Sequence, residues 1–292
     1  MNALLAWYFV TVWGAGYIAT KAGLHYAPPF TFLALRFGFG LLCLLPVFFL
    51  SGTTWPSRRD IGHLAIAGLL MHVVQLGGSH YAQYLGMSAG VAALIISTQP
   101  LFTALIAWKF MQERIQPGQW LGVAVGLAGV ALVVWHKIDV REVGWDSLAA
   151  TLIALTGVTA ATLYQKRFVP RAGLRAASLI QFAVAFAAFV PLAVGVEGFR
   201  VTWSPTLFAS IGFLVIFTSI LGVSALYVLL RHGEATRVTS MFYLPPVIAV
   251  VLELATFGVM PSGIALAGIA MACAGVAMTV WSGRWNSPSS SR

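Results

Sequence analysis

Long apolar runs alternate with short polar or Pro/Gly-rich stretches along the whole chain. A helix needs about 20 apolar residues to cross about 30 Å of hydrocarbon, and the runs have about this length. The pattern therefore predicts an all-α polytopic membrane protein with ten transmembrane helices. The predicted helices cover residues 4–21, 30–50, 62–84, 88–109, 118–136, 147–167, 176–196, 207–230, 235–258 and 262–282.

The two halves of the chain overlay when one is displaced by 146 residues, half of the length of 292. Residues 81–135 then fall on residues 227–281 without a gap. Five helices in each half give the second half the opposite orientation in the membrane, which defines an inverted repeat. We expect repeats at residues 1–140 and 141–284, followed by a polar tail at 285–292. Identical pairs include Gly122 with Gly268, Gly129 with Gly275, Trp135 with Trp281, and Pro100 with Pro246.

Composition and charge support a membrane location. Only 9% of the residues are charged, whereas soluble domains carry about 25%. A net charge of +9 would suggest nucleic acid in a soluble protein, but the basic residues here follow the parity of the loops. With a cytoplasmic N-terminus, 12 of the 17 Lys and Arg residues lie on the inner side and 4 on the outer side, as the positive-inside rule requires. We expect both termini in the cytoplasm, a lipid bilayer around the chain and no nucleic-acid partner.

A set of short motifs recurs in both halves of the chain. In the first repeat these are Trp13-Gly14, Lys21, Leu35-Arg36-Phe37, residues 81–89, Pro100, Glu113-Arg114 and Gly122. In the second repeat they are Tyr227, Ala235, Pro246, Gly268 and Gly275. In their order and spacing these positions resemble the EamA family of the drug/metabolite transporter superfamily, over nearly the whole chain. The second repeat departs from the pattern at Val259-Met260, which replace the acidic-basic pair Glu113-Arg114 of the first repeat.

This resemblance implies ten transmembrane helices in two inverted five-helix repeats around a central cavity. Helices 1, 3, 4, 6, 8 and 9 would line that cavity. The resemblance also implies a multi-pass protein of the bacterial cytoplasmic (inner) membrane. The aromatic helix centres and the His80-Tyr81 pair are most similar to the bacterial aromatic amino acid exporters of the family. Because one fold serves many substrates, the fold transfers more safely than the substrate.

A polar stripe runs along one face of the predicted helix 62–84. It consists of His72, Gln75, Ser79 and, one turn later, Gln83. An unpaired polar group at mid-membrane costs several kcal/mol, so the stripe should face a cavity or other helices. As an alternative to lining a cavity, these groups hydrogen-bond neighbouring helices, where each contributes about 1 kcal/mol. His80 lies with Tyr84 on a second face, and it can hold a substrate carboxylate or respond to pH.

Prolines occupy equivalent positions at the centres of two predicted helices, as Gln99-Pro100 and Pro245-Pro246. Proline removes an intrahelical hydrogen bond and frees a carbonyl about one turn earlier, so both helices should kink and act as hinges. The alternative is a static kink that only shapes packing. Paired breaks in inverted repeats point to a binding site. Gln99, Ser219 and Tyr243 are therefore candidate ligand contacts, and the alternative for Tyr243 is a lipid-facing position.

Trp13 and Tyr17 lie one turn apart on the first predicted helix. Their rings can sandwich an aromatic substrate, and stacking adds about 0.5–1.5 kcal/mol beyond burial. Packing between helices explains either ring equally well.

Two charged residues lie inside predicted spans, Arg36 in the second helix and Glu253 in the ninth. Both fall about 8–9 Å below the outer ends of their helices, at 1.5 Å per residue. We expect them to form an ion pair or join one polar network, and the alternative is separate snorkelling to the interface. The first helix contains no carboxylate, so proton antiport like that of the small dimeric multidrug exporters is not supported.

These features predict a transporter that exports small amphipathic metabolites, foremost aromatic amino acids, by alternating access between the repeats. The alternative is a related carrier for another amino acid, a nucleoside or a sugar derivative, with or without coupling to protons. The chain has no enzyme motif such as H-E-x-x-H or G-x-S-x-G, so we expect no catalytic residues. Cys43 and Cys273 lie in apolar runs, and we expect neither a metal nor a cofactor. One chain should suffice as a functional monomer.

Overall fold

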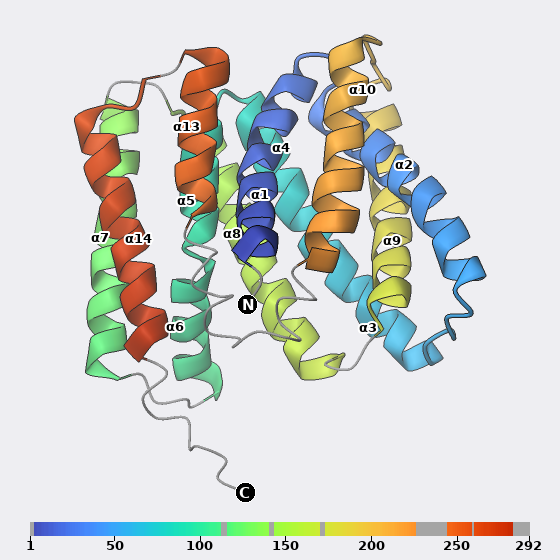
Figure 1. The fold of residues 1–292 in the computed structure, drawn as a ribbon, viewed down its shortest axis with the longest axis horizontal. Coiled ribbons are helices and arrows are strands. Elements are labelled where there is room, and N and C mark those ends of the chain that lie inside the picture. The colour runs from blue at the N-terminus through green and yellow to red at the C-terminus, as the bar shows by residue number, and fades with distance from the viewer. Residues whose placement is uncertain are drawn as a thin grey trace, which may run out of the picture. The chain divides into compact units, whose positions relative to one another are not determined.

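The computed structural model describes residues 3–111, 116–139, 143–169, 173–225, 244–258 and 260–282. Every regular element within these ranges is a helix (Figure 1). Each of the ten predicted spans overlaps at least one of these helices. The helices are α1 (Ala3–Leu24), α2 (Pro29–Leu50), α3 (Arg58–Gly68), η1 (Leu69–Val74), α4 (Gln75–Tyr84), α5 (Ala89–Ser97), α6 (Gln99–Met111), α7 (Pro117–Asp139), α8 (Trp145–Phe168), α9 (Leu174–Gly195), α10 (Pro205–Gly212), η2 (Phe213–Gly222), α13 (Pro245–Phe257) and α14 (Gly263–Ser282).

Six helical stretches within the described ranges are long and apolar enough to cross a membrane. Shorter apolar helices cover Ala89–Thr103, Pro245–Phe257 and Gly263–Met278. The chain is therefore a helical protein with several membrane-spanning segments, and the count of ten spans stays a prediction. The six stretches are Pro29–Leu50, Arg58–Tyr84, Pro117–His136, Trp145–Phe168, Leu174–Gly195 and Pro205–Ala225.

The chain forms two compact units, and neither coincides with a sequence repeat. The first unit combines Met1–Ala15, Ser88–Val143 and Ser224–Arg292. The second combines Gly16–Met87 with Gly144–Val223. Each unit therefore takes helices from both halves of the sequence.

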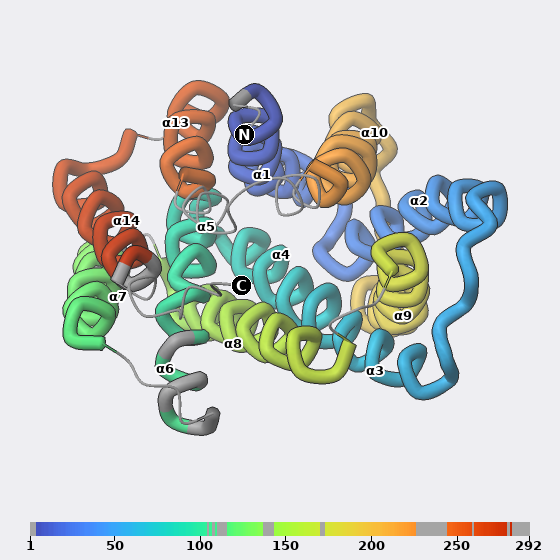
Figure 2. Tube along the Cα trace, turned by 60° about the horizontal axis from the view of Figure 1, so that its bottom comes forward, coloured from blue at the N-terminus to red at the C-terminus, as the bar shows by residue number. Residues whose placement is uncertain are grey.

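In the first unit the equivalent helices of the two repeats, α7 and α14, pack against each other along a glycine-lined seam (Figures 1 and 2). A Cβ atom added to Gly275 would lie 2.6 Å from the Gly122 carbonyl oxygen. A Cβ atom added to Gly129 would lie 2.6 Å from the Gly268 carbonyl oxygen. Only glycine permits such a close approach of two backbones. Because Gly122 meets Gly275 while Gly129 meets Gly268, the two helices are antiparallel.

In the second unit α2 and α9, which are also equivalent in the two repeats, pack together through large aromatic side chains. Phe37 stacks on Phe189 with ring centroids 5.9 Å apart. Near the other end of α2, Phe48 packs with Ala176 at the start of α9. These contacts make α2 and α9 antiparallel as well. Equivalent helices thus run in opposite directions in both units, as an inverted repeat requires.

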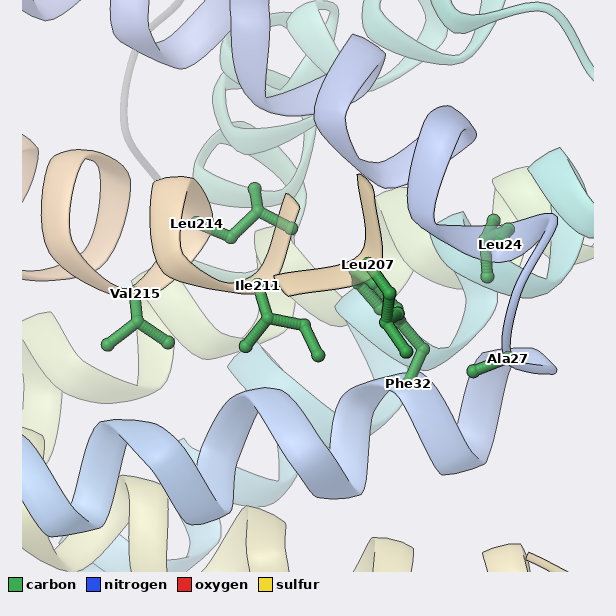
Figure 3. Close-up of a cluster of buried hydrophobic side chains, with 7 residues drawn as sticks. All are labelled: Leu24, Ala27, Phe32, Leu207, Ile211, Leu214 and Val215. Carbon is green, nitrogen blue, oxygen red and sulfur yellow. The ribbon is translucent and has the colours of Figure 1, made fainter. Parts of the chain in front are cut away.

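An apolar cluster holds the end of α1, the start of α2 and the α10–η2 helix together in the second unit (Figure 3). Phe32 and Leu207 are fully buried in it. The start of α2 is further held by Glu197, whose Oε1 accepts from Phe30 N at 3.0 Å and whose Oε2 accepts from Thr31 N at 2.7 Å. These bonds satisfy amide groups that a helix start leaves without intrahelical acceptors. The cluster consists of Leu24, Ala27, Phe32, Leu207, Ile211, Leu214 and Val215.

Candidate functional site

Two π-helical segments in the second unit occupy equivalent positions in the two repeats. Displaced by 146 residues, Leu69–Val74 falls on 215–220, within Phe213–Gly222. The same displacement brings His72 onto Thr218. Such segments are rare, and they occur frequently at functional sites. The pair of π segments therefore indicates a candidate functional site in the second unit.

Polar groups from α1 and α4 meet beside these segments. His80 is only 2% exposed, and its Nε2 lies 3.4 Å from Oγ1 of Thr20, which is 3% exposed. The imidazole also packs near the Phe32 ring, with centroids 5.8 Å apart. His80 is thus in the interior of its unit, whereas Tyr84, which shares its helix face, is exposed.

The predicted polar stripe lies on η1 and α4. Ser79 and Gln83 are buried, and His72 and Gln75 are half-buried. The His72 ring lies between two phenylalanines, 5.2 Å from the Phe37 centroid and 5.3 Å from that of Phe182. The stripe therefore combines polar groups with flat apolar surface.

Arg36 is a buried cation within this polar region. It is 6% exposed, and its Nη2 donates to Ser219 Oγ at 3.2 Å. The guanidinium lies 6.0 Å from the centre of the Phe37 ring, and the Phe37 ring centre is 5.2 Å from that of His72. Two predicted site residues, Arg36 and Ser219, are thereby brought into contact.

Several buried polar atoms of the second unit have no hydrogen-bond partner within the described ranges. In lipid an unpaired polar atom cannot turn to bulk water, so such a set needs an explanation. All of them lie on α2, the π segments or α4, which are the elements that surround the polar region. The atoms are Arg36 Nε, His72 Nδ1, His80 Nδ1, Gln83 Oε1 and Thr218 Oγ1.

In the first unit the predicted proline break divides one helix into α5 and α6 at Thr98. Ser97 Oγ donates to the Leu94 carbonyl at 2.7 Å, and Thr98 Oγ1 donates to the Ile95 carbonyl at 2.6 Å. Hydroxyl groups of the chain therefore occupy carbonyls just before Pro100. Gln99 begins α6 and is half-buried.

Trp13 lies beside the second proline break. Its ring is 5.0 Å from that of Phe9. A Cβ atom on the neighbouring Gly14 would lie 2.8 Å from the Pro245 carbonyl oxygen. Trp13 thus has a packing partner and also adjoins the start of α13, where Pro245 and Pro246 are buried.

Tyr17, one turn later, is half-buried and belongs to the second unit. Tyr243 lies outside the described residues.

Glu253 joins α13 to the start of α5. It is 3% exposed, its Oε1 accepts from Ala89 N at 3.0 Å, and its Oε2 accepts from Gly90 N at 2.9 Å. A small cavity of about 30 Å³ lies beside it, far below the roughly 300 Å³ or more of ligand pockets. Glu253 and Arg36 belong to different units, and their ion pair stays a prediction.

Within the described ranges, no group of three or more His, Cys, Asp or Glu side chains is placed to hold a metal ion. Sequence reasoning did not single out Thr20 or Thr218. The internal repeat could have identified Thr218, because it is the equivalent of His72. Thr20 lies one turn beyond Tyr17 on α1, but nothing in its local pattern indicates a contact with His80.

Apolar helices of membrane-spanning length that bury polar side chains define a polytopic helical membrane protein. Residues 1–135 and 145–281 each match the family model described as "EamA-like transporter family". The chain belongs to this family, and its class is that of membrane transporters rather than enzymes.

Similar proteins include two named bacterial transporters. The "Uncharacterized inner membrane transporter YedA" of Escherichia coli (strain K12) is 28% identical over 86% of this chain and 80% of its own length. The "Probable amino-acid metabolite efflux pump" of Salmonella typhimurium (strain LT2) is 26% identical over 96% of this chain and 95% of its own length. A protein of known crystal structure shares the fold with a TM-score of 0.66 and 20% identity, over 97% of this chain and 98% of that one.

Proposed function

We propose that this chain exports small amphipathic metabolites, foremost aromatic amino acids, across the bacterial inner membrane by alternating access. One observation carries the proposal. The second unit of a member of a transporter family buries the polar side chains of Arg36, Ser79 and His80 among apolar helices, and Arg36 is hydrogen-bonded to the half-buried Ser219. A transporter of zwitterions needs such a region, because both charged ends of the substrate must exchange water for protein groups.

The substrate class is supported by the chemistry of the candidate site residues. Trp13 and Tyr17 on α1 offer aromatic surface, and Gln75, Gln99 and His80 offer neutral donors and acceptors. Neutral groups of this kind can hold an amino acid without a full counter-charge, which favours release. The Salmonella relative is named an amino-acid metabolite efflux pump, and the His80-Tyr81 pair resembles the aromatic amino acid exporter YddG.

The transport cycle that we propose uses ten transmembrane helices in inverted repeats, with both termini in the cytoplasm and one chain as the functional unit. The hinges are the proline breaks at Pro100 and at Pro245-Pro246. The compact units each contain helices of both repeats. A movement of one unit as a body would therefore carry parts of both repeats together.

Counterflow in proteoliposomes tests this function. Liposomes that contain the purified chain are loaded with unlabelled substrate, and uptake of labelled tryptophan, phenylalanine or threonine is measured with and without a pH gradient. We expect saturable flux of the two aromatic amino acids, unaffected by the gradient. His80→Ala and Gln99→Ala should lower this flux, whereas Tyr84→Ala, at an exposed position of the same helix as His80, should not.

The alternative function has its own result in the same assay. If threonine or another metabolite is transported and the aromatic amino acids are not, the chain is a carrier for another metabolite and the proposal of aromatic substrates is rejected. Flux that requires the pH gradient would indicate coupling to protons.

A further inference from the structure

We propose that Arg36 and Ser219 form a carboxylate-binding site, in which Arg36 Nε takes the carboxylate of a small organic acid. The proposal rests on the proposed transport function and adds to it the group of the substrate that this unit binds. It also gives the polar region an orientation, with the acidic end of the substrate held at η2.

The buried cation lacks a carboxylate within its own unit. The acidic residues of the second unit are Asp60, Asp146 and Glu197, and none lies within 4.0 Å of the Arg36 nitrogens. Asp60 and Asp146 are at helix starts, while Glu197 caps α2. Removing a guanidinium from water is costly unless an anion pairs with it. The second unit thus buries a cation and supplies no anion of its own to pair with it.

The donors around Arg36 fit a carboxylate. Nη2 is held by Ser219, while Nε has no partner among the residues that the structure describes. Ser219 follows Thr218, whose buried Oγ1 is also without a partner in these ranges. A guanidinium presents a planar fork that matches the two oxygens of a carboxylate, and hydroxyl groups can donate to the remaining lone pairs.

The surroundings favour an organic acid over a phosphate. Arg36 is the one Lys or Arg of the described second unit that is buried, whereas a phosphate dianion would call for further cations. Phe37 lies beside the guanidinium, and Phe182 contacts Phe37 edge to face at 5.1 Å. These rings provide apolar surface for the body of a monocarboxylate.

The π segment explains why this position can hold a ligand. Thr218 and Ser219 both lie on η2, and π segments of this kind occur frequently at functional sites. The equivalent segment η1 carries His72, whose Nδ1 also lacks a partner among the described residues. The paired segments therefore border one polar region from both repeats.

Binding to matched acids and amides tests the site. The full purified chain is titrated with tryptophan and tryptophan amide, and with threonine and threonine amide. We expect the intact chain to bind at least one acid about 10- to 100-fold more tightly than its amide. Arg36→Gln should weaken acid binding to the level of the amide and leave amide binding nearly unchanged. Arg175→Gln, which removes an exposed charge of the same unit, should retain the discrimination.

The ligand series keeps the proposal testable even if Arg36→Gln does not fold, because the acid-to-amide ratio is measured on the unaltered chain. Equal binding of acid and amide, or no binding of either acid, would overturn the carboxylate site. The proposal would also be overturned if Glu253→Gln lost the preference for acid over amide as Arg36→Gln does. Acid binding would then require Glu253 as well as Arg36.

The outcome for the site is distinct from the outcome for the substrate class. Discrimination for threonine alone, lost in Arg36→Gln, supports the site and rejects aromatic substrates. Aromatic counterflow without any discrimination supports the function and rejects the site.

Discussion

Arg36 Nη2 donates a hydrogen bond to Ser219 Oγ at 3.2 Å, and this bond joins a helix of the first sequence repeat to a helix of the second. The two residues are 183 positions apart in the chain. They nevertheless belong to one compact unit, beside a π segment and two aromatic rings. The relationship shows that the polar region depends on both repeats.

Ser219→Ala should lower the free energy of unfolding by about 1.5–3 kcal/mol, since it removes an acceptor from a buried charged donor. Thermal unfolding in detergent measures the effect. Ser224→Ala, at an exposed position of the same helical stretch, is the matched control and should change the melting temperature little. An equal shift in both variants would show that the bond to Arg36 does not stabilise the protein.

Glu253→Gln should lower the unfolding free energy by about 1–3 kcal/mol, because an NH2 group replaces one of the two oxygens that accept from Ala89 N and Gly90 N, so that a donor then faces a donor. Hydrogen exchange at the start of α5 should rise in the variant. Asp146→Asn removes an exposed carboxylate at a helix start, and its cost should stay below about 1 kcal/mol. Unchanged exchange at Gly90 would contradict the cap.

Gly275→Ala should lower the unfolding free energy by about 1–3 kcal/mol, because the added methyl group overlaps the backbone of α7. Gly263→Ala in the same helix has open space around it and should be neutral or stabilising by about 0.5–1 kcal/mol. The melting temperature should therefore fall in Gly275→Ala and stay unchanged or rise in Gly263→Ala. A Gly275→Ala variant as stable as Gly263→Ala would refute the close packing of α7 and α14.

Pro100→Ala should slow transport and leave equilibrium binding of substrate nearly unchanged. Removal of a proline constraint of about 3 kcal/mol favours a continuous helix over 89–111 and stiffens the break at Thr98. Counterflow rate and binding affinity, measured separately, test this expectation. Pro46→Ala, a proline inside α2, is the control for general effects on helix stability. Normal transport by Pro100→Ala would indicate a static kink.

Local sequence features placed the helices and one of their breaks correctly. Apolar runs between polar punctuation located α2, α8 and α9 to within a few residues, because the lengths of these runs match the membrane thickness. Pro100 indicated the division between α5 and α6, since proline cannot complete the helical hydrogen-bond pattern. The wider turn at Leu69–Val74 was not foreseen, because its residue types also suit a regular α-helix.

The contacts between residues that are far apart in the chain were harder to predict from the sequence. Glu253 and Arg36 were expected to meet or to join one polar network, because both are charged and both lie near the outer ends of their helices. Within their own units, Glu253 accepts from the amide groups of Ala89 and Gly90, and Arg36 donates to the hydroxyl group of Ser219. A direct pair of Glu253 with Arg36 stays a prediction. Backbone amides carry no sequence signature, so a carboxylate that caps a distant helix cannot be distinguished from one that pairs with a cation.

The sequence by itself determined that this chain is apolar and helical, and that its two halves repeat each other. Periodicity and composition are sufficient for these conclusions, because burial in lipid imposes a length and a polarity on every helix. Only the tertiary structure decided which helices pair, and it assembled each compact unit from both repeats. Apolar attraction has no direction, so helix partners are set by local shape. Gly275 against Gly122 and Phe37 against Phe189 provide that shape, and it exists only once the helices are in contact.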